Sequence, residues 1–453
     1  MNQSNHRKSA FFRFIKAMFP DFKYQLNDDN NSYTLIWARK KLKENITVPS
    51  FYKDLPVTAI GPSAFSNCNK IEGVTVSNGI TYIGKGAFEN CSNLSEIYLP
   101  EGIEALSENM FGGCKKLATI HIPKSLKAVG KSAFYACSSL FEINLPDTVT
   151  IIEEAAFYLS GLRRFSFPKD IISIAPFTFR SCAFSTIIIP EGIKDIGQQA
   201  FARCKELEEI TIPKSIRKLG EGAFMGCRNL KKAVLPEDIE EISDFMFHGC
   251  HSLESITVPD GVKRVGNDAF SFCHRLKEVQ LPDSITYIGE NAFSDNSCIS
   301  SGNLPKNLEM IKRLAFYKCR CPDEIVIPDT VKIIEDKAFL DCRSLKSIVL
   351  SKNITSINKF TFCDCSSLDN VTVPEGVTSI GEKAFAYCTK LKSISLPHSL
   401  NKINISVFIE CDSLNEITYN GTINDWHLIE KTGNPNDEEK PTVICTDGKT
   451  SFN

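Results

Sequence analysis

The stretch Leu219–Glu241, LGEGAFMGCRNLKKAVLPEDIEE, is the clearest copy of a unit that recurs along the chain. Its phenylalanine returns sixteen times. Thirteen of the fifteen intervals between these phenylalanines are 23 residues, and the other two are 22. A fixed period in this range is typical of a solenoid, in which each repeat forms one coil. The repeat phenylalanines are Phe65, Phe88, Phe111, Phe134, Phe157, Phe179, Phe201, Phe224, Phe247, Phe270, Phe293, Phe316, Phe339, Phe362, Phe385 and Phe408.

The two halves of the unit predict different local structure. The segment L-x-x-I-x-[ILV]-P alternates apolar and polar residues, as at Ile210, Thr211 and Ile212, and this period predicts a strand. Proline follows in thirteen units, as at Pro213, and ends each strand at one level because it cannot donate to a ladder. The other half, I-G-x-x-A-F-x-x-C, predicts a turn and then a short helical or 3-10 segment.

One such unit cannot bury its apolar residues alone, whereas stacked units cover one another. We therefore predict an α/β repeat solenoid with a parallel β-sheet along one face and short helical or 3-10 segments on the other. The predicted parts are an N-terminal basic segment (1–32), an N-terminal cap (33–59), sixteen repeats of 22 or 23 residues (60–419), and a C-terminal cap and tail (420–453). The repeats favour one elongated domain.

The recurring pattern A-F-x-x-C-x-x-L-x-x-I-x-[IL]-P resembles the BspA-like class of the leucine-rich repeat family. The resemblance covers about residues 46–431. It implies a curved solenoid with a binding role rather than a catalytic one. The segment ITVPS at 46–50 resembles the strand that opens such solenoids, and Y-N-G-T…W from Tyr419 to Trp426 resembles their final segment.

The composition excludes two classes of protein. Lys plus Arg is 52 and Asp plus Glu is 54, so the net charge is −2 and does not favour nucleic-acid binding, which needs a basic domain. Since no apolar run approaches 18 residues, the sequence predicts no transmembrane segment.

Fourteen of the eighteen cysteines occupy the slot three residues after the repeat phenylalanine, and Ser160 and Asn296 fill the other two slots. A free cysteine behaves as a small buried hydrophobe, so we predict a reduced, buried ladder. Disulfides between neighbouring coils are the alternative. Two C-x-C pairs, Cys319 with Cys321 and Cys363 with Cys365, each predict one ladder cysteine and one exposed cysteine, with a metal or redox pair as the alternative.

The N-terminal piece RKSAFFRFIKAMF is basic, with apolar residues at helical spacing, and predicts a cap helix or a frayed terminus. Contact of this helix with a membrane surface is the alternative. Arg13 and Lys16 interrupt the apolar run that a signal peptide needs, so the sequence favours a cytoplasmic location. The family resemblance implies a cell-surface or secreted protein instead.

Catalytic or metal chemistry has little support. Seven histidines include His248 and His251, which flank Cys250 in turns and are expected to be solvated rather than metal ligands. GKGAF and GEGAF lack the lysine and hydroxyl of a phosphate loop. We expect no cofactor, no metal and no enzymatic activity.

The outward positions of the predicted strands form the surface most suited to binding. Tyr98, His121, Phe141 and Arg164 lie in adjacent units there and include residue types that anchor interfaces. They are the candidate contact patch for a protein partner, with a glycan as the alternative ligand. The leading prediction is a non-enzymatic binding scaffold, which the resemblance extends to adhesion or host contact. The alternatives are a structural spacer and a scaffold for an unrecognised enzymatic site.

Two zones depart from the regular pattern. Both 22-residue intervals flank the unit at Phe179, which predicts a local kink or change of curvature over residues 157–201. Residues 294–325 are degraded in pattern and are predicted to be the least stable part of the stack. At the C-terminus, Trp426 and Ile429 are predicted to lie on a short helix that covers the last coil.

Overall fold

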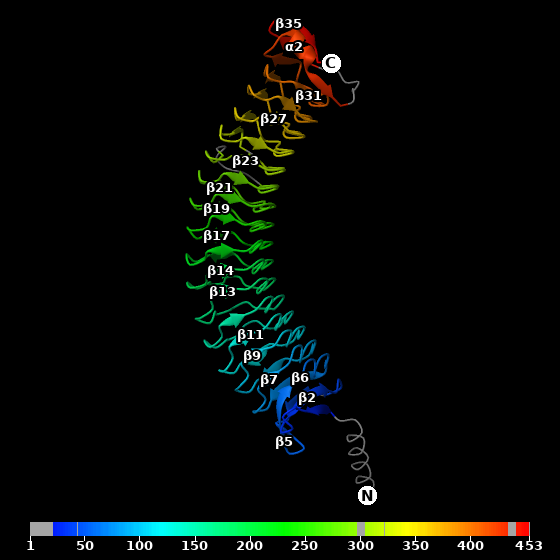
Figure 1. Ribbon diagram of the computed structural model, residues 1–453, viewed down its shortest axis with the longest axis vertical. Helices are drawn as coiled ribbons and strands as arrows, with labels where there is room; N and C mark the ends of the chain where they lie inside the picture. The colour runs from blue at the N-terminus through cyan, green and yellow to red at the C-terminus, as the bar shows by residue number, and fades with distance from the viewer. Residues whose placement is uncertain (1–20, 43, 297–303, 321, 434–440, 453) are drawn as a thin grey trace. The chain divides into compact units, whose positions relative to one another are not determined.

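The computed structural model describes residues 21–42, 44–296, 304–320, 322–433 and 441–452. The chain forms two compact units, Met1–Leu207 (unit 1) and Glu208–Asn453 (unit 2), and their boundary falls inside the predicted repeat region. Each unit is a β-solenoid whose coils stack one on another, with most strands pairing parallel to the next coil (Figure 1). The strand half of the repeat therefore folds as predicted.

The N-terminal cap of unit 1 is a small sheet. β1 (Phe22–Leu26) pairs antiparallel with β2 (Tyr33–Ala38), which pairs parallel with β5 (Leu55–Ile60). β4 (Phe51–Tyr52) adds an antiparallel hairpin to β5. The sheet thus begins at Phe22, ahead of the boundary predicted at Tyr33. The helix predicted near the N-terminus falls outside the described residues.

Two strand ladders run along each unit. The strand face is the ladder built by L-x-x-I-x-[ILV], as predicted. In unit 1 it comprises β3 (Glu44–Val48), β6 (Ile71–Val76), β8 (Glu96–Tyr98) and β10 (Thr119–His121). In unit 2 it comprises β15 (Glu209–Thr211), β17 (Lys232–Val234), β19 (Ser255–Thr257), β21 (Glu278–Gln280), β24 (Glu324–Val326), β26 (Ser347–Val349), β28 (Asn370–Thr372), β30 (Ser393–Leu396), β32 (Glu416–Tyr419) and β34 (Thr442–Cys445).

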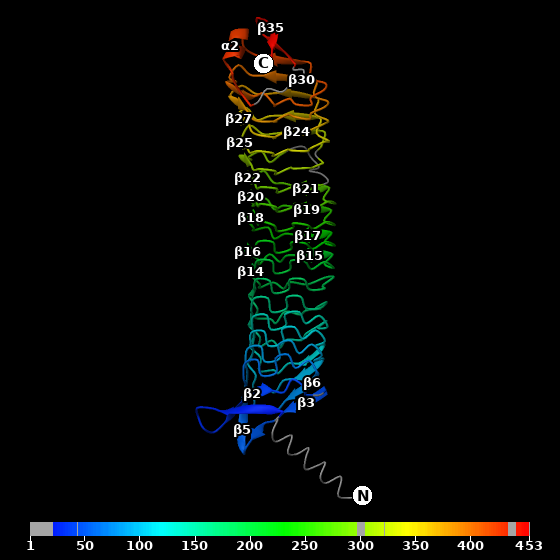
Figure 2. The same ribbon diagram turned by 90° about the vertical axis from the view of Figure 1, so that its right-hand side faces the viewer.

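The second ladder was not predicted. It is built by the two residues that precede the repeat's I-G glycine position, and its strands lie along the opposite edge of the coils from the strand face (Figure 2). Its members in unit 1 are β7 (Tyr82–Ile83), β9 (Ala105–Leu106), β11 (Ala128–Val129), β12 (Ile151–Ile152), β13 (Ser173–Ile174) and β14 (Asp195–Ile196). In unit 2 they are β16 (Lys218–Leu219), β18 (Glu241–Ile242), β20 (Arg264–Val265), β22 (Tyr287–Ile288), β23 (Met310–Ile311), β25 (Ile333–Ile334), β27 (Ser356–Ile357), β29 (Ser379–Ile380), β31 (Lys402–Asn404) and β33 (Glu430–Thr432).

The segment G-x-x-A-F-x-x-C forms turns, and the helical or 3-10 face predicted here is not present in the described coils. The hydrogen bonds give the reason. The Glu89 amide donates to the Gly86 carbonyl three residues back at 3.0 Å, but the neighbouring Phe88 amide donates to Met110 of the next coil, also at 3.0 Å. A continuous 3-10 segment needs every amide to bond within its own segment. Because alternate amides bond between coils instead, this turn face is a third ladder.

Backbone conformation sets the geometry of the turn face. The second residue after the repeat phenylalanine has a positive φ, between 52° and 76°, in all sixteen coils. In unit 1, three of the seven residues at this position are glycine or asparagine, and the other four are Ala136, Leu159, Ser181 and Arg203. Residues with a side chain normally avoid this region of φ. Stacking therefore holds several side-chain-bearing residues in a strained conformation.

This strain gives a stability prediction. Ala136, with φ 56°, should gain about 0.5–1 kcal/mol of unfolding free energy when changed to glycine, because relief of the left-handed conformation exceeds the added entropy of the unfolded chain. Gly249→Ala is the matched reverse change: its φ is 69°, and an added Cβ would meet no heavy atom closer than 3.8 Å. It should lose a similar amount. Urea unfolding measures both, and destabilisation by Ala136→Gly would contradict the conformational explanation.

The core of each unit is a column of stacked phenylalanine rings. Ring centroids of successive repeat phenylalanines lie 4.9–5.8 Å apart from Phe65 to Phe201 in unit 1. They lie 5.0–6.1 Å apart from Phe224 to Phe408 in unit 2. The predicted inward position of these rings is confirmed.

The buried cysteines lie beside this column. The sixteen described cysteines are all buried free thiols, as the ladder prediction requires; Cys298 and Cys321 lie outside the described residues. A ladder thiol donates to the carbonyl of the repeat phenylalanine one coil earlier, as from Cys91 to Phe65 at 3.1 Å. Cys363, which was expected to be exposed, is only 4% exposed. The prediction that Cys363 is exposed was wrong, because this residue, which directly follows the repeat phenylalanine Phe362, points partly into the stack.

In unit 1 the strand face is interrupted. From residue 141 to residue 190 the described coils contain no strand on this face. Phe165 and Phe167 replace isoleucine at the inward positions, and with Phe184 they pack edge-on against Phe179. The coils still lie close together, since the Arg163 amide donates to the Phe141 carbonyl at 2.9 Å and the ring centroids of Phe157 and Phe179 are 5.6 Å apart. Strand pairing on this face is thus lost one coil before the zone at 157–201, and the kink or change of curvature predicted there stays a prediction.

The C-terminal cap of unit 2 contains the predicted helix. α2 (Ile423–Leu428) starts at Thr422, whose side chain accepts from the Asp425 amide while the Asp425 carboxylate accepts from the Thr422 amide. Trp426 is fully buried and donates its ring N–H to the Ser451 carbonyl at 3.1 Å. β34 and β35 (Gly448–Ser451) form a closing hairpin. Trp426 and Ile429 therefore cover the last coil as predicted.

Candidate binding surface

The first half of the predicted patch is a pair of stacked rings on the strand face of unit 1. Tyr98 in β8 and His121 in β10 lie opposite each other in the parallel register. Their ring centroids are 3.7 Å apart and their planes differ by 8°. The Tyr98 hydroxyl donates to Glu96 at 2.9 Å, and His121 Nε2 lies 3.0 Å from the same carboxylate oxygen. Glu96 therefore fixes both rings.

The electrostatics of this pair follow from the shared carboxylate. Hydrogen bonds from His121 and Tyr98 lower the pKa of Glu96, so it stays ionised. The same bond raises the pKa of Tyr98. The result is a pair of exposed, stacked aromatic rings with the negative Glu96 carboxylate at their edge.

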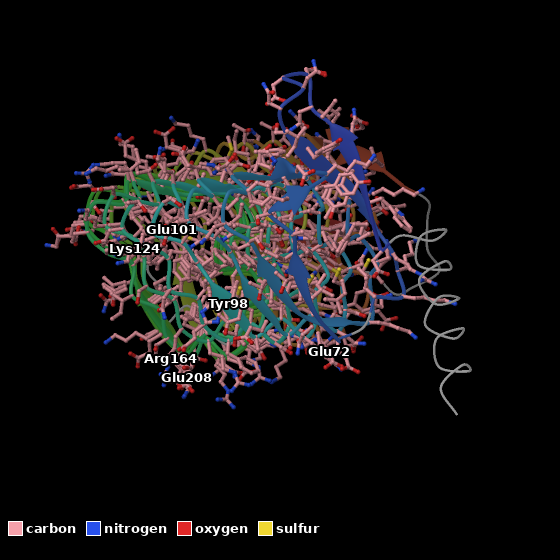
Figure 3. All side chains as sticks on the ribbon, turned by 90° about the horizontal axis from the view of Figure 1, so that it is seen from below. Glu72, Tyr98, Glu101, Lys124, Arg164 and Glu208 are labelled. Carbon is pink, nitrogen blue, oxygen red and sulfur yellow. The ribbon has the colours of Figure 1, made fainter. Side chains whose placement is uncertain are left out.

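The second half of the patch is in the interrupted coils. Phe141 is 50% exposed, and the guanidinium of Arg163 lies over its ring at 4.9 Å. Arg164, the residue that was predicted, is exposed and meets Phe141 only through its amide, 3.4 Å from the Phe141 carbonyl. The structure thus brings Tyr98 to His121 and Phe141 to Arg163. Figure 3 labels Tyr98 and Arg164 on one side of the coils, and Glu101 and Lys124 in the turns that follow β8 and β10.

Two members of this surface were missed by the sequence reasoning. Arg163 was not singled out, because the early leucine at Leu162 shifts the strand pattern by one residue. Ile188 occupies an outward strand position and is 85% exposed, which is the highest exposure among the large apolar residues described. An outward isoleucine among outward Thr and Ser was the signal that could have identified it.

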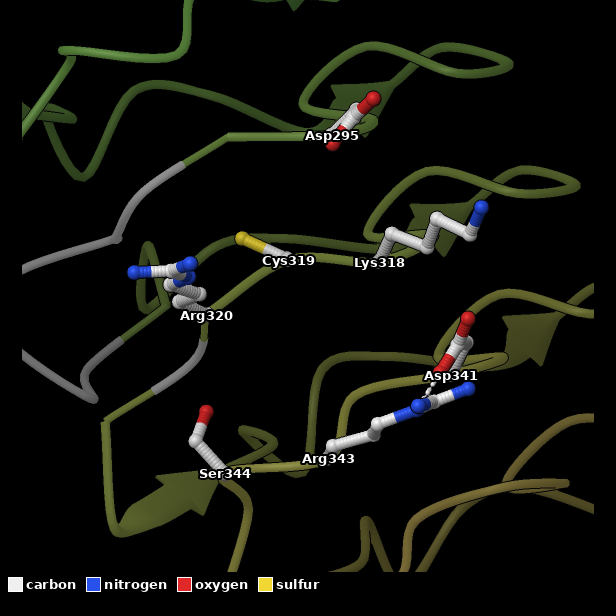
Figure 4. Close-up of a pocket in the computed structure, with 7 residues that line it drawn as sticks. All are labelled: Asp295, Lys318, Cys319, Arg320, Asp341, Arg343 and Ser344. Carbon is white, nitrogen blue, oxygen red and sulfur yellow. Dashed lines mark hydrogen bonds and ion pairs between the residues drawn. The ribbon is translucent and has the colours of Figure 1, made fainter.

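Outside this surface, the described residues give weaker support for a metal, ligand or membrane site. The described residues contain no group of three or more His, Cys, Asp or Glu side chains that could hold a metal ion. A hollow of about 610 Å³ in unit 2 is lined by Lys318, Arg320 and Arg343 together with two aspartates, Asp295 and Asp341 (Figure 4). Arg343 is already paired with Asp341. Within the described chain, no helix has the length and apolarity needed to cross a membrane.

Fold and surface together define a leucine-rich-repeat scaffold that presents exposed strand positions. Residues 58–183, 128–242, 172–300, 218–323 and 309–427 match the family described as BspA type leucine rich repeat region (6 copies). The chain belongs to this family.

Solved structures of leucine-rich repeat proteins are similar to this chain. A leucine-rich repeat protein from Bacteroides ovatus is 24% identical, with 95% of this chain and 99% of that chain covered and a TM-score of 0.61. A leucine rich cell surface protein from Faecalibacterium prausnitzii is also 24% identical over 92% of this chain and 97% of that chain, with a TM-score of 0.40. No match was found among curated proteins.

Proposed function

We propose that the protein is a non-enzymatic scaffold that binds a protein partner through the strand face of unit 1. The binding surface comprises Tyr98, His121, Phe141, Arg163 and Ile188. The observation that carries the proposal is the exposure of Tyr98 (43%), Phe141 and Ile188 in alternate coils, with His121 and Arg163 in the coils between them. Singly exposed apolar residues are ordinary on protein surfaces, but several large ones on one face are typical of an interaction site.

The fixed Tyr98–His121 stack also favours binding. Two rings already held by Glu96 lose little side-chain entropy when a partner covers them, so more of the contact energy remains for affinity. A glycan is the second candidate ligand for the same rings. Adhesion is the more specific role that this surface would serve.

Partner capture tests the proposal. Full-length protein is immobilised, and bound proteins are identified for the wild type, for Tyr98→Ala with Phe141→Ala, and for Tyr82→Ala. Tyr82 is 56% exposed on the second ladder and is a matched control. A specific partner should bind the wild type and Tyr82→Ala, and lose about 2 kcal/mol, or roughly thirtyfold in Kd, with the double variant. Equal retention by all three variants would reject this surface, and no selective partner at all would favour a structural spacer.

For the compartment we favour the cytoplasm, because sixteen buried free thiols suit a reducing environment. The cell surface is the alternative. Fractionation of the producing cells tests the choice, and recovery of the chain in a fraction that external protease digests would overturn it.

A further inference from the structure

A cationic corner runs along unit 2 between the turn face and the strand face. It consists of Arg228, His251 and His274, which directly follow the ladder cysteines of three consecutive coils, and of Arg275, which follows His274. Arg228, His274 and Arg275 are exposed, and His251 is half-buried. Coils that pair as parallel strands are about 4.8 Å apart, so the corner presents cationic or protonatable groups at that regular interval.

The corner differs from the rest of the surface in its pairing. Elsewhere in unit 2 a lysine typically meets a carboxylate one coil away, as in Lys231–Glu208 and Lys306–Asp283, both at 2.8 Å. Among the described residues, no carboxylate pairs with the guanidinium of Arg228 or Arg275. The two arginines therefore carry positive charge that no described carboxylate pairs with.

The two histidines are held together within this field. Their ring centroids are 5.0 Å apart. Burial lowers the pKa of His251, and its neighbours His274, Arg228 and His248 lower it further. Next to them, burial lowers the pKa of His248 while Asp268 opposes that shift. An added anion would favour the protonated form of His251, so binding of the anion and uptake of a proton by that ring are coupled.

An apolar surface and a further run of cations border the corner. Phe272 is 41% exposed and meets His274 edge-on, with ring centroids 6.1 Å apart. The same column of the repeat continues at Arg320 and Arg343, which line the hollow of Figure 4. A ligand at the corner would therefore meet Phe272 beside the charged groups.

We propose that the cationic corner binds a linear acidic polysaccharide. A polymer with a negative group on successive sugars matches cations that repeat from coil to coil, and the apolar face of a sugar ring suits Phe272. Nucleic acid is the alternative polyanion, and the oligonucleotide in the test below distinguishes the two. This site lies in unit 2 and is independent of the protein-binding surface proposed for unit 1.

The test measures binding of fluorescent dextran sulfate to the full chain by anisotropy, with neutral dextran as the uncharged probe. We expect dextran sulfate to bind, neutral dextran not to bind, and added salt to weaken the complex because it screens exposed charges. Arg228→Ala with Arg275→Ala should weaken binding about tenfold or more. Arg217→Ala with Lys263→Ala removes two paired cations of the same unit and should change affinity less than about twofold.

The histidines supply a second readout. Lowering the pH from about 7.5 to about 5.5 should strengthen binding, since a bound anion beside His251 favours the protonated form of that ring. His251→Gln should remove most of that pH dependence while leaving the fold intact. The proposal fails if both arginine and control doubles lose affinity equally, or if neutral dextran binds as well. It also fails if a single-stranded oligonucleotide of equal charge binds as tightly as dextran sulfate.

Discussion

Above about pH 9 the protein is expected to lose stability steeply and unfold within roughly one further pH unit, because its buried thiols cannot ionise in the folded state. Burial raises the pKa of Cys182 and of Cys273 to about 12. Burial likewise raises the pKa of Cys250. In the unfolded chain these thiols titrate near 8.5.

The sign follows from the raised folded-state pKa. Below about pH 8.5 both states hold the thiol protons, and the contribution of the ladder is fully present. As the pH rises toward 12, the unfolded state releases protons that the folded state keeps, so unfolding becomes more favourable. Each fully buried thiol then removes about 1.4 kcal/mol of unfolding free energy per pH unit. Several such thiols together exceed the 5–15 kcal/mol typical of a folded protein.

Urea unfolding at a series of pH values, with thiolate absorbance recorded alongside circular dichroism, measures this effect. Removing two thiols with Cys182→Ala and Cys273→Ala should reduce the pH slope by up to about 2.7 kcal/mol per pH unit. A ladder that ionised while the circular dichroism of the fold persisted would show that the thiols are accessible. No pH dependence and no thiolate signal would show that they are paired as disulfides.

Most of the fold was predictable because the repeat itself is a strong signal. The phenylalanine of Phe224 recurs in all sixteen coils, and the types of Cys227 and Leu230 recur in most of them. A position that is apolar in coil after coil must face the common core. The second ladder was harder to predict, since it rests on two residues per coil, such as Tyr287 and Ile288, which are too few for a visible alternation. The turn face was misassigned because hydrogen bonds between coils replace those within a segment, and such partners are distant in sequence.

The sequence predicted which rings belong to the candidate surface better than it predicted which side chains contact them. Tyr98 and His121 share an outward column, so their spacing of 23 residues already places them in neighbouring coils. Arg163 and Arg164 differ by one position, and in a strand this decides which face a side chain occupies. The interrupted pairing around Phe165 removes that rule, so the sequence could not decide which arginine contacts Phe141.

Phe247→Ala should lower the free energy of unfolding by about 3–5 kcal/mol, which is the range for removing a buried aromatic ring. The Phe247 side chain is fully buried between two rings, with centroids 5.9 Å from Phe224 and 5.7 Å from Phe270. Thr257→Ala is the control from the same coil, because its side chain points outward from β19 and is exposed. It should change stability by less than about 0.5 kcal/mol.

The effect should also reach the neighbouring coils, since a solenoid gains its stability at the interfaces between repeats. Hydrogen exchange of the amides that bond between coils tests this, as at Phe224 to Met246 and Phe270 to Ala292, with N–O distances of 3.1 and 2.9 Å. Both amides should exchange faster in Phe247→Ala, while those near Phe385 should change less. Equal losses of stability in Phe247→Ala and Thr257→Ala would mean that the phenylalanine column does not form the core. Uniform acceleration across unit 2 would mean that its coils unfold as one cooperative block rather than through their nearest neighbours.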